Sequence, residues 1–436
     1  MKKKYFIWLL LVVTVHYGCT KSKPLPNSTK FVKVINGKLT IDNKPYTFVG
    51  VNYWYGSNLA ALGAEGQARL IRELDYLKQL GVTNLRIQAC SEGGDEVLFG
   101  VKPSLQPKPG EYNETLFQGL DFLLSELNKR DMKAVLALNN YWSWTGGMAK
   151  YRSWAEGSEI PYPASEKLGS WDIYMQYADG FYENTKAVEA FKQHISVMLN
   201  RTNTITQVKY SQDPAIMAWQ LANEPRGGKS EAQRKIFIKW IHETAAYIKS
   251  LDTLHLVSTG SEGSVGHHWN MDDYTEAHNT ENIDYLTLHL WPQNWGWFNP
   301  ENPEGTIDSS LVKAKQYIFD HLAVSKKLNK PITLEEYGLA RDKGSFLVNS
   351  ETKYRNLFFG FVFSLTTEQV QQGNLSGSNF WSWAGEGTPP RPGELWKTGD
   401  PFLGDPPHEA QGWYSVYQTD TNTISIIKEY TNKLPK

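Results

Sequence analysis

The chain contains very little cysteine: only Cys19 and Cys90 occur among its 436 residues. Cys19 stands at the end of an N-terminal leader, so Cys90 is left alone in the remainder of the chain. A framework of intramolecular disulfides is therefore excluded. Cys90 ends an apolar run typical of a strand, and we expect a buried, unreactive thiol there.

A large net charge and long apolar runs are also missing. The chain has 45 basic and 46 acidic residues, a net charge of -1, and therefore no overall field that would attract nucleic acid or an anionic membrane. The apolar residues 5–15 are too few to span a bilayer as a helix, and no other segment is long and apolar enough to do so. A neutral partner suits this composition.

The first 19 residues resemble a bacterial lipoprotein signal. Three lysines at positions 2–4 precede the apolar stretch, and Gly18-Cys19 ends it. In such signals the cysteine, here Cys19, is lipidated and becomes the first residue of the mature protein. We expect an exported protein of the cell envelope or the medium. Residues 20–30 would form a tether, and residues 31–436 would form the folded domain. A lipid anchor would be the only contact of the protein with a membrane.

Strand-like and helix-like segments alternate along the folded domain. A short hairpin is expected over residues 31–44, with turns at Asn36-Gly37 and Asp42-Asn43. Helical patterns separate eight apolar runs, which we interpret as strands at 47–53, 84–89, 134–139, 216–222, 255–259, 285–290, 332–336 and 379–383. Continuous apolar strands that alternate with helices predict a parallel sheet covered by helices, an α/β fold.

Eight strand–helix units favour closure into a single (β/α)8 TIM barrel. The alternative is an open, doubly wound sheet, whose first strand would be followed by a glycine-rich phosphate loop. Asn52-Tyr53-Trp54-Tyr55 stands at that place instead. In a barrel the chemistry lies at the C-terminal ends of the strands, so the polar residues at those ends become the candidates.

Two glutamates stand at such strand ends. Glu224 follows the apolar run 218–222, with Pro225 immediately after it, and Glu336 ends the run 331–336. The barrel would bring both carboxyls to one rim although they lie 112 positions apart (336 − 224). Glycoside hydrolysis uses such a pair, one carboxyl to protonate the leaving oxygen and the other to attack the sugar or activate water.

Other strand ends carry matching polar or aromatic groups. Arg86 ends the second strand, and an arginine near a nucleophilic carboxylate favours its ionised form. Asn140 and Trp142 follow the third strand, His289 ends the sixth and Trp381 lies in the eighth. Each residue alone has an ordinary structural explanation, but their joint order around the rim does not.

These residues resemble a known family. Arg86, Asn223-Glu224-Pro225, His289, Glu336-Tyr337-Gly338 and Trp381 are similar to glycoside hydrolase family 5, within a larger clan of retaining (β/α)8 hydrolases. The resemblance covers roughly residues 47–430. The string from Leu221 to Gly227 looks most like the β-mannanase branch, as does Asn139-Asn140-Tyr141-Trp142.

The resemblance implies a role for each residue. Glu224 would be the acid/base and Glu336 the nucleophile, and no metal or cofactor would be needed. Asn223 would hold the sugar 2-hydroxyl, while His289 and Arg86 would orient the carboxylates and the sugar.

The remaining expected contacts are aromatic or amide groups. Trp381 would stack beneath the ring, and Asn140 and Trp142 would contact the substrate. Trp291 replaces the tyrosine that usually hydrogen-bonds the nucleophile in this family. Glu335 should point away from the site because neighbouring strand residues face opposite sides.

Three loops at the same rim are candidate substrate walls. The sixth loop, 291–298, holds three tryptophans, and the fifth, 262–270, holds His267-His268-Trp269. The long eighth loop, 385–413, is rich in proline and glycine and could close one end of a groove.

The implied activity is retaining endo-β-1,4-mannanase hydrolysis of mannan, glucomannan or galactomannan. An exo-β-mannosidase or a β-1,4-glucanase on the same scaffold remains open, and so does a glycan-binding protein that has lost catalysis. The intact glutamate pair argues against the last, because a binding protein does not need both carboxyls.

Overall fold

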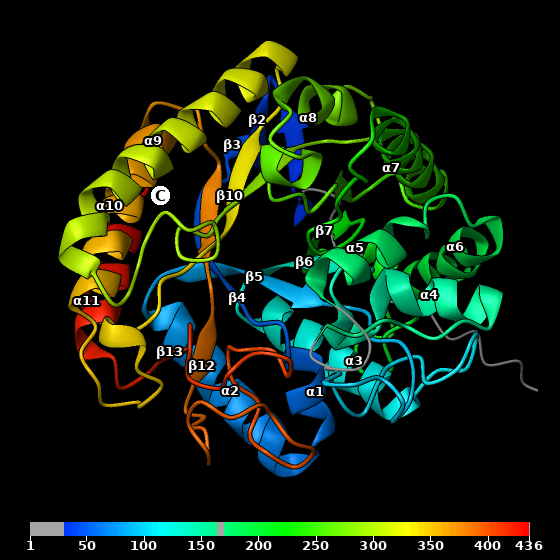
Figure 1. Cartoon of the computed structure of the whole chain (residues 1–436), viewed down its shortest axis with the longest axis horizontal. Coiled ribbons are helices and arrows are strands. Elements are labelled where there is room, and N and C mark those ends of the chain that lie inside the picture. Colours follow the sequence, from blue (N-terminus) through cyan, green and yellow to red (C-terminus); the bar gives the residue numbers. More distant parts are fainter. Residues whose placement is uncertain (1–29, 164–169, 436) are drawn as a thin grey trace, which may run out of the picture.

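The computed structural model describes residues 30–163 and 170–435. Its centre is a parallel sheet of eight strands, which confirms the predicted α/β (β/α)8 barrel (Figure 1). In chain order the strands are β4 (Phe48–Asn52), β5 (Val82–Gln88), β6 (Lys133–Ala137), β7 (Ile216–Gln220), β8 (Leu256–Ser258), β9 (Leu286–Leu290), β10 (Ile332–Tyr337) and β11 (Gly377–Phe380). Every run predicted as a strand overlaps one of them.

The sheet closes on itself. Its strand order is β8-β7-β6-β5-β4-β11-β10-β9, so β8 and β9 form its two edges. These edges meet where the backbone nitrogen of Asp284 donates to the oxygen of Val257 at 2.9 Å. Closure of this kind leaves no exposed strand edge, and it orients all eight C-terminal ends toward one rim.

Helices cover the outside of the barrel, as Figure 1 shows. Six of these helices begin at a residue whose side chain caps the first turn. Ser230, for example, caps the helix that begins at Glu231 and exchanges hydrogen bonds with Gln233 in a capping box. The helices are α1 (Gly56–Ala61), α2 (Ala64–Gln79), α3 (Glu114–Lys129), α4 (Gly147–Glu156), α5 (Trp171–Asp179), α6 (Thr185–Asn200), α7 (Glu231–Leu251), α8 (Met271–His278), α9 (Pro303–Leu328), α10 (Lys353–Gln371) and α11 (Thr421–Thr431).

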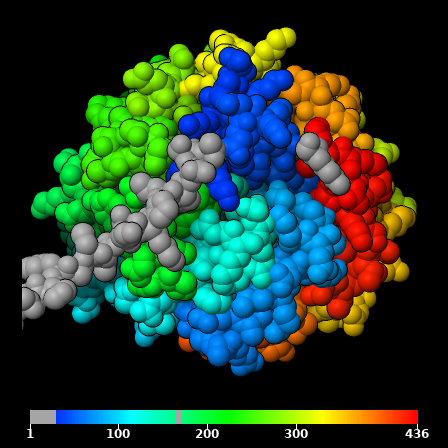
Figure 2. All heavy atoms as spheres, turned by 180° about the vertical axis from the view of Figure 1, so that it is seen from behind, coloured from blue at the N-terminus to red at the C-terminus, as the bar shows by residue number. Residues whose placement is uncertain are grey.

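A small antiparallel sheet closes the N-terminal end of the barrel. It consists of β1 (Lys33–Ile35), β2 (Lys38–Ile41) and β3 (Lys44–Pro45), with left-handed turn residues at the predicted turns. Val32 and Leu39 pack against apolar side chains at the starts of the barrel strands. In Figure 2 this N-terminal segment, in blue, lies across the back face. The predicted hairpin is confirmed, and the catalytic chemistry is left to the opposite rim.

The eighth loop carries a second small sheet. Its strands β12 (Trp383–Gly385) and β13 (Val416–Tyr417) pair in parallel and lie beside α2 (Figure 1). The signal at 1–19, with Cys19, and all of the tether at 20–30 except Lys30 lie outside the described residues. Within the described part of the chain, no helix combines the length and hydropathy that a membrane span requires. Cys90 is buried, as expected, and burial raises the pKa of its thiol.

Candidate active site

The C-terminal rim collects the residues predicted for the site into one contact network. Arg86 contacts Glu336 and Asn223, and the amide of Asn223 donates to Asn140. His289 and Trp142 contact Glu224, while Trp291 contacts Glu336 and packs on Trp381. Each of the nine residues therefore touches at least one other, although they come from six different strand ends.

The backbone at Glu224 is held in a strained conformation. Its φ of 49° lies in the left-handed region, which costs a residue with a side chain about 1–3 kcal/mol. The backbone nitrogen of Glu224 donates to the oxygen of Gly260 at 3.0 Å. Gly260 itself has a φ of 74°, and a Cβ there would lie 1.9 Å from the oxygen of Ala222. A glycine is thus required for the fifth loop to hold Glu224 in place.

The carboxyls of Glu224 and Glu336 face each other closely. One oxygen of each lies within 4.8 Å of the other and of a ring nitrogen of His289. Glu224 is 7% exposed and Glu336 is 2% exposed. A separation of about 5–5.5 Å is typical of retaining glycosidases, while inverting enzymes need about 6.5–9.5 Å to admit a water. The observed spacing fits retention.

Arg86 organises the floor of the site. Its guanidinium forms an ion pair with Glu336 and donates to the side-chain oxygen of Asn223 at 2.7 Å. It also donates to Gln220 at 2.7 Å and to Asn52 at 3.2 Å. A buried arginine with fixed donors holds planar acceptors in one geometry, which a lysine cannot do.

His289 bridges the two carboxyls. Its Nδ1 lies 2.6 Å from Oε1 of Glu224 and 3.3 Å from Oε2 of Glu336. Burial lowers the pKa of His289 well below its usual range, so the ring is neutral. A neutral ring that approaches carboxylate oxygens through Nδ1 carries its proton there and acts as a donor.

Trp142 and Arg226 build the side of the site around Glu224. The indole nitrogen of Trp142 donates to Oε2 of Glu224 at 2.6 Å. Arg226 lies over the Trp142 ring at 4.7 Å and donates twice to the buried carboxylate of Glu262, at 2.6 and 2.8 Å. Burial raises the pKa of Glu224, and the positive charge of Arg226 opposes that rise.

The two carboxyls titrate as a pair. Burial raises the pKa of Glu336 as well; Arg86 lowers it, and the charge of Glu224 raises it further. Two buried carboxyls at this spacing do not both ionise easily. The ion pair with Arg86 favours the charged form of Glu336, while Glu224 has no such ion pair with Arg86.

Two tryptophans form an aromatic floor beside Glu336. The indole nitrogen of Trp291 donates to Oε2 of Glu336 at 3.2 Å, so the replacement of tyrosine by tryptophan keeps a donor at this carboxylate. The Trp381 ring packs edge-on against Trp291, with centroids 5.8 Å apart. Both rings are mostly buried, and the expected stacking of a sugar on Trp381 stays a prediction.

Asn223 and Asn140 form a hydrogen-bonded pair of amides. Asn140 is fully buried, and its oxygen accepts from Asn223 at 3.1 Å and from the backbone nitrogen of Trp142 at 3.1 Å. The structure thus places Asn140 as a support for Asn223 and Trp142. A direct contact between Asn140 and the substrate stays a prediction.

Glu335 does not point away from the site as expected. It lies inside the barrel, 3.6 Å from Arg86, and accepts from Gln220 at 2.6 Å. The pairing between β10 and β9 shifts between Leu334 and Glu336, so Glu335 is an extra residue in its strand and the simple alternation fails. Gln220, which links Arg86 to Glu335, carried no signal in the sequence beyond its place in an apolar strand.

The eighth loop supplies residues that the motif did not identify. His408 stacks on Trp144, with ring centroids 6.3 Å apart, and lies edge-on to Trp171 at 6.1 Å. Burial, then the charges of Asp405 and Glu224, raises the pKa of Glu409. Its Oε2 is buried without a hydrogen-bond partner among the described residues.

Glu224, His289 and Glu336 could in principle hold a metal ion, since their ligand atoms lie within 4.8 Å of one another. The chemistry of these atoms does not favour one. Glu336 is paired with the positive charge of Arg86, and Glu224 already accepts from Trp142. A cation here would be repelled by the guanidinium and would displace these donors. The absence of a metal from the function stays a prediction.

Comparison with known proteins agrees with this geometry. A family model described as "GH family 5 beta-mannosidase-like" matches residues 29–436. The chain belongs to this family of glycoside hydrolases. The resemblance read from the strand-end residues is confirmed.

Relatives of this family 5 chain cover most of its length. Mannan endo-1,4-beta-mannosidase 4 of Solanum lycopersicum is 33% identical over 311 residues, 69% of this chain and 70% of that protein. A family 5 mannosidase from Rhizomucor miehei has a crystal structure that is 36% identical with a TM-score of 0.86, covering 94% of this chain and 98% of that one. An endo-1,4-beta-mannanase from the same organism is 26% identical with a TM-score of 0.66, covering 92% and 98%.

The sixth loop of this family 5 barrel divides between two faces. Trp291 faces the site, and Asn294 accepts from the hydroxyl of Tyr414 in the eighth loop. Trp295 and Trp297 pack instead on Trp269 and on α9. The expected substrate wall is therefore limited to the first part of the loop.

Proposed function

We propose that this family 5 chain hydrolyses β-1,4-mannosidic bonds in mannan, glucomannan or galactomannan as a retaining endo-β-1,4-mannanase. The observation that carries this proposal is the buried carboxyl pair, with oxygens within 4.8 Å and Arg86 bound to Glu336. The names of its relatives in Solanum lycopersicum and Rhizomucor miehei supply the substrate class.

The reaction proceeds in two displacements. Glu336 attacks the anomeric carbon while the proton of Glu224 passes to the leaving glycosidic oxygen, which breaks that bond. Glu224, now ionised, removes a proton from water, and the resulting hydroxide displaces Glu336 from the sugar. The proton taken from water restores the acid form of Glu224, and the anomeric configuration is that of the substrate.

Supporting side chains keep these charges in place. Arg86 and Trp291 stabilise the carboxylate of Glu336 as leaving group in the second step. Asn223, fixed by Arg86 and Asn140, presents its second amide hydrogen to the sugar 2-hydroxyl, which is axial in mannose. His289 spans both carboxyls and holds their spacing as the proton moves.

A second candidate is exo-β-mannosidase action on the same scaffold. One observation favours it: His408 of the eighth loop lies edge-on to Trp171, whose ring in turn lies edge-on to Trp142, and the charge of Glu224 raises the pKa of Glu409. A loop that walls the site leaves room for a chain end rather than for a continuous chain. The Rhizomucor miehei protein whose structure has a TM-score of 0.86 is named a mannosidase.

Product sizes distinguish these modes. Endo action on mannohexaose yields a ladder of shorter oligomers from the first minutes, whereas exo action releases mannose steadily from one end. Activity on cellulose oligomers with none on mannan would instead indicate a β-1,4-glucanase.

Azide rescue tests the assigned roles and the non-catalytic alternative together. Glu336→Ala should abolish turnover because it removes the nucleophile, and circular dichroism should show that the variant stays folded. Azide should then restore cleavage and give a product of inverted configuration, since the small anion enters from the face that Glu336 occupied. Near-normal activity of Glu336→Ala without azide would contradict the roles, and an inactive wild-type protein that retains mannan would select the glycan-binding alternative.

We also propose that the protein is exported and anchored through a lipid on Cys19. The leader residues 1–19 support this proposal. In a bacterial host, the protein should partition with membranes and incorporate labelled palmitate. Cys19→Ala should remove both properties, and a labelled Cys19→Ala protein would contradict the proposal.

A further inference from the structure

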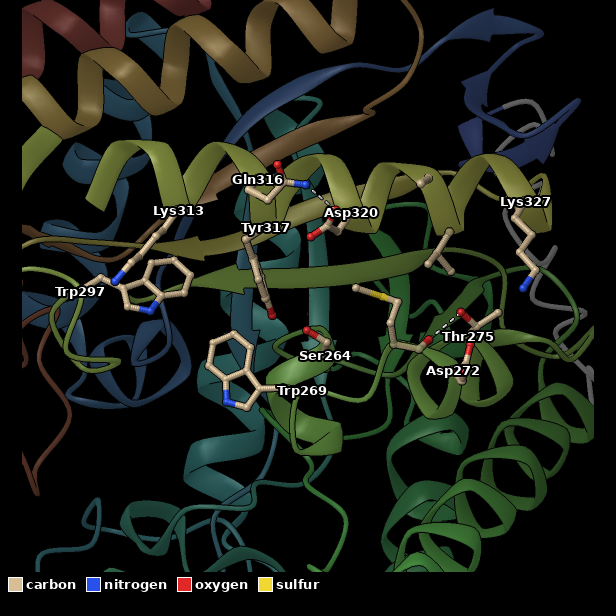
Figure 3. A pocket seen from close by; sticks show the side chains of 13 residues that line it. Ser264, Trp269, Asp272, Thr275, Trp297, Lys313, Gln316, Tyr317, Asp320 and Lys327 are labelled. Carbon is tan, nitrogen blue, oxygen red and sulfur yellow. Dashed lines mark hydrogen bonds between the residues drawn. The ribbon is translucent and has the colours of Figure 1, made fainter. Parts of the chain in front are cut away.

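A groove runs down the outer wall of the barrel between α8 and α9. It has a volume of about 670 Å³, and none of the nine predicted site residues lines it. Figure 3 shows Trp269, Trp297 and Tyr317 gathered toward one end, with Lys327 at the other. The α9 side is a single helical stripe from Lys313 to Lys327, so the groove follows about 21 Å of helix at 1.5 Å per residue.

The aromatic end presents an unusual tryptophan. Trp269 is 53% exposed, whereas Tyr317 beneath it is buried. Its ring lies edge-on to Tyr317 and to Trp295, with centroids 5.9 and 5.6 Å apart, and 6.0 Å from the Trp297 ring. These neighbours fix the Trp269 ring while leaving part of its surface free. An apolar ring surface with a polar edge suits the C–H face of a pyranose.

The backbone holds Trp269 in this position at a cost. His268 and Trp269 have φ angles of 53° and 63°, consecutive left-handed conformations that residues with side chains rarely adopt. The ring of His268 anchors the turn through a 2.9 Å contact between its Nε2 and the oxygen of Gly227. Strain of this kind persists where the surroundings fix it, and it concentrates at binding sites.

Along the rest of the groove the lining suits a neutral, hydroxyl-rich chain. Its charged residues balance, with Lys313 and Lys327 against Asp272 and Asp320. Gln316 donates to Asp320 at 2.7 Å and leaves its own oxygen free to accept from a ligand hydroxyl. A balanced lining gives a phosphate or nucleic acid no attraction, because such ligands require a positive surface.

The groove begins beside two loops that contact the catalytic segments. Trp297 belongs to the sixth loop, whose first residue Trp291 contacts Glu336. Trp269 belongs to the fifth loop, which pairs with the acid/base segment where the nitrogen of Gly227 donates to the oxygen of Gly266 at 3.0 Å. A polymer held in the groove would thus have one end next to the rim that carries the site.

We propose that this groove is a second binding site for the β-mannan chain, in which Trp269 is the stacking platform and Gln316 and Asp320 bind hydroxyls. The proposal rests on the mannan-hydrolase function. It adds a site that retains polymer at the enzyme surface, while short substrates reach the catalytic carboxyls without using it.

The test separates retention from turnover. Affinity electrophoresis through gels with and without galactomannan is performed in the Glu336→Ala background, in which the polymer is not digested. Trp269→Asn removes the ring, and asparagine accepts the left-handed backbone. We expect about a fivefold weaker affinity for the polymer, equivalent to the loss of one aromatic stacking contact. Phe319→Ala, an exposed aromatic on α9 outside the groove, is the matched control and should migrate as the parent.

In the active enzyme, Trp269→Asn should lower kcat/KM for galactomannan relative to that for a short aryl β-mannoside. The double variant Gln316→Ala, Asp320→Ala changes only exposed helix side chains, and weaker retention by it supports the groove even if Trp269→Asn folds poorly. Unchanged retention in both variants would overturn the inference. A change from dimer to monomer in sedimentation velocity with Trp269→Asn would do so too, since the groove would then hold a second copy. Failure of the wild-type enzyme to cleave any mannan would instead refute the proposed function itself.

Discussion

Replacing Arg86 with methionine tests how the site divides its charge. Arg86 is buried and donates to four side chains: Glu336, Asn223, Gln220 and Asn52. Methionine fills a similar volume and leaves the carboxylate of Glu336 buried without its cation. Breaking a buried pair in this way costs about 3–5 kcal/mol. If that cost falls on the ionised enzyme, kcat/KM should drop by about 100-fold to a few thousand-fold.

The pH dependence carries the sharper signature. The guanidinium lowers the pKa of Glu336, so its removal should raise that pKa and shift the acidic limb of the kcat/KM profile to higher pH. The assay uses an aryl β-mannoside with a good leaving group, so that proton donation by Glu224 does not limit the rate. Arg86→Lys is the matched control, because lysine keeps the positive charge but lacks the several fixed donors of the guanidinium. Its activity should fall, while its acidic limb should shift less toward high pH than that of Arg86→Met.

An acidic limb that stays in place in Arg86→Met would refute this reasoning. It would mean that Arg86 positions Asn223 and Gln220 without controlling the ionisation of Glu336. Circular dichroism and thermal unfolding of both variants exclude a folding defect as the cause.

Two other perturbations have expected outcomes. Glu92 is buried, and burial raises its pKa from 4.5 to about 8, so folded Glu92 keeps a proton that the unfolded chain loses in this window. The free energy of unfolding should therefore fall by up to about 5 kcal/mol as pH rises from about 4.5 to 8. Urea titrations at pH 5 and 8 should show this fall in the parent protein and not in Glu92→Gln. The same change in unfolding free energy between the two pH values in both proteins would contradict this. The indole nitrogen of Trp142 donates to Glu224 at 2.6 Å, and this hydrogen bond lowers the pKa of the carboxyl. Trp142→Phe removes the hydrogen bond and should therefore raise that pKa. The basic limb of kcat/KM should shift to higher pH, with a loss of about tenfold in rate. An unshifted limb would show that the indole packs beside Glu224 without affecting its pKa.

The sequence predicted the barrel because the patterns that indicate its strands and helices are formed by residues close together in the chain. All eight strands appear as apolar runs, and each polar residue that ends a run, such as Arg86 or His289, lies at the C-terminal rim by the geometry of a parallel barrel. The network around Glu224 and Glu336 followed from this rule and from the family resemblance. No knowledge of loop conformation was needed for these residues.

Other parts of the site depend on contacts that local patterns do not encode. Glu335 turns inward because β10 gains a residue relative to β9, a register shift visible only when both strands are paired. Arg226 finds Glu262 across two loops, 36 positions apart in the chain. His408 comes from a long loop, where it packs on Trp144 and on Trp171.

The division of the sixth loop has a similar origin. Its three tryptophans lie within seven residues of one another, but they occupy different faces. Trp291 faces Glu336, whereas Trp295 and Trp297 pack on the outer wall. A left-handed Gly296 separates the last two, and the hydrogen bond from Tyr414 to Asn294 fixes the turn. Aromatic content alone does not say which face a loop residue occupies.

Trapping the covalent intermediate tests the central claim most directly. A 2-deoxy-2-fluoro β-mannosyl fluoride slows both steps and the second more than the first, so the glycosyl-enzyme should accumulate with one added sugar mass. Fragmentation of the labelled peptide should place the sugar on Glu336 and not on the adjacent Glu335. A label on any other residue, or unlabelled protein that releases product of inverted configuration, would contradict the double displacement between Glu336 and Glu224.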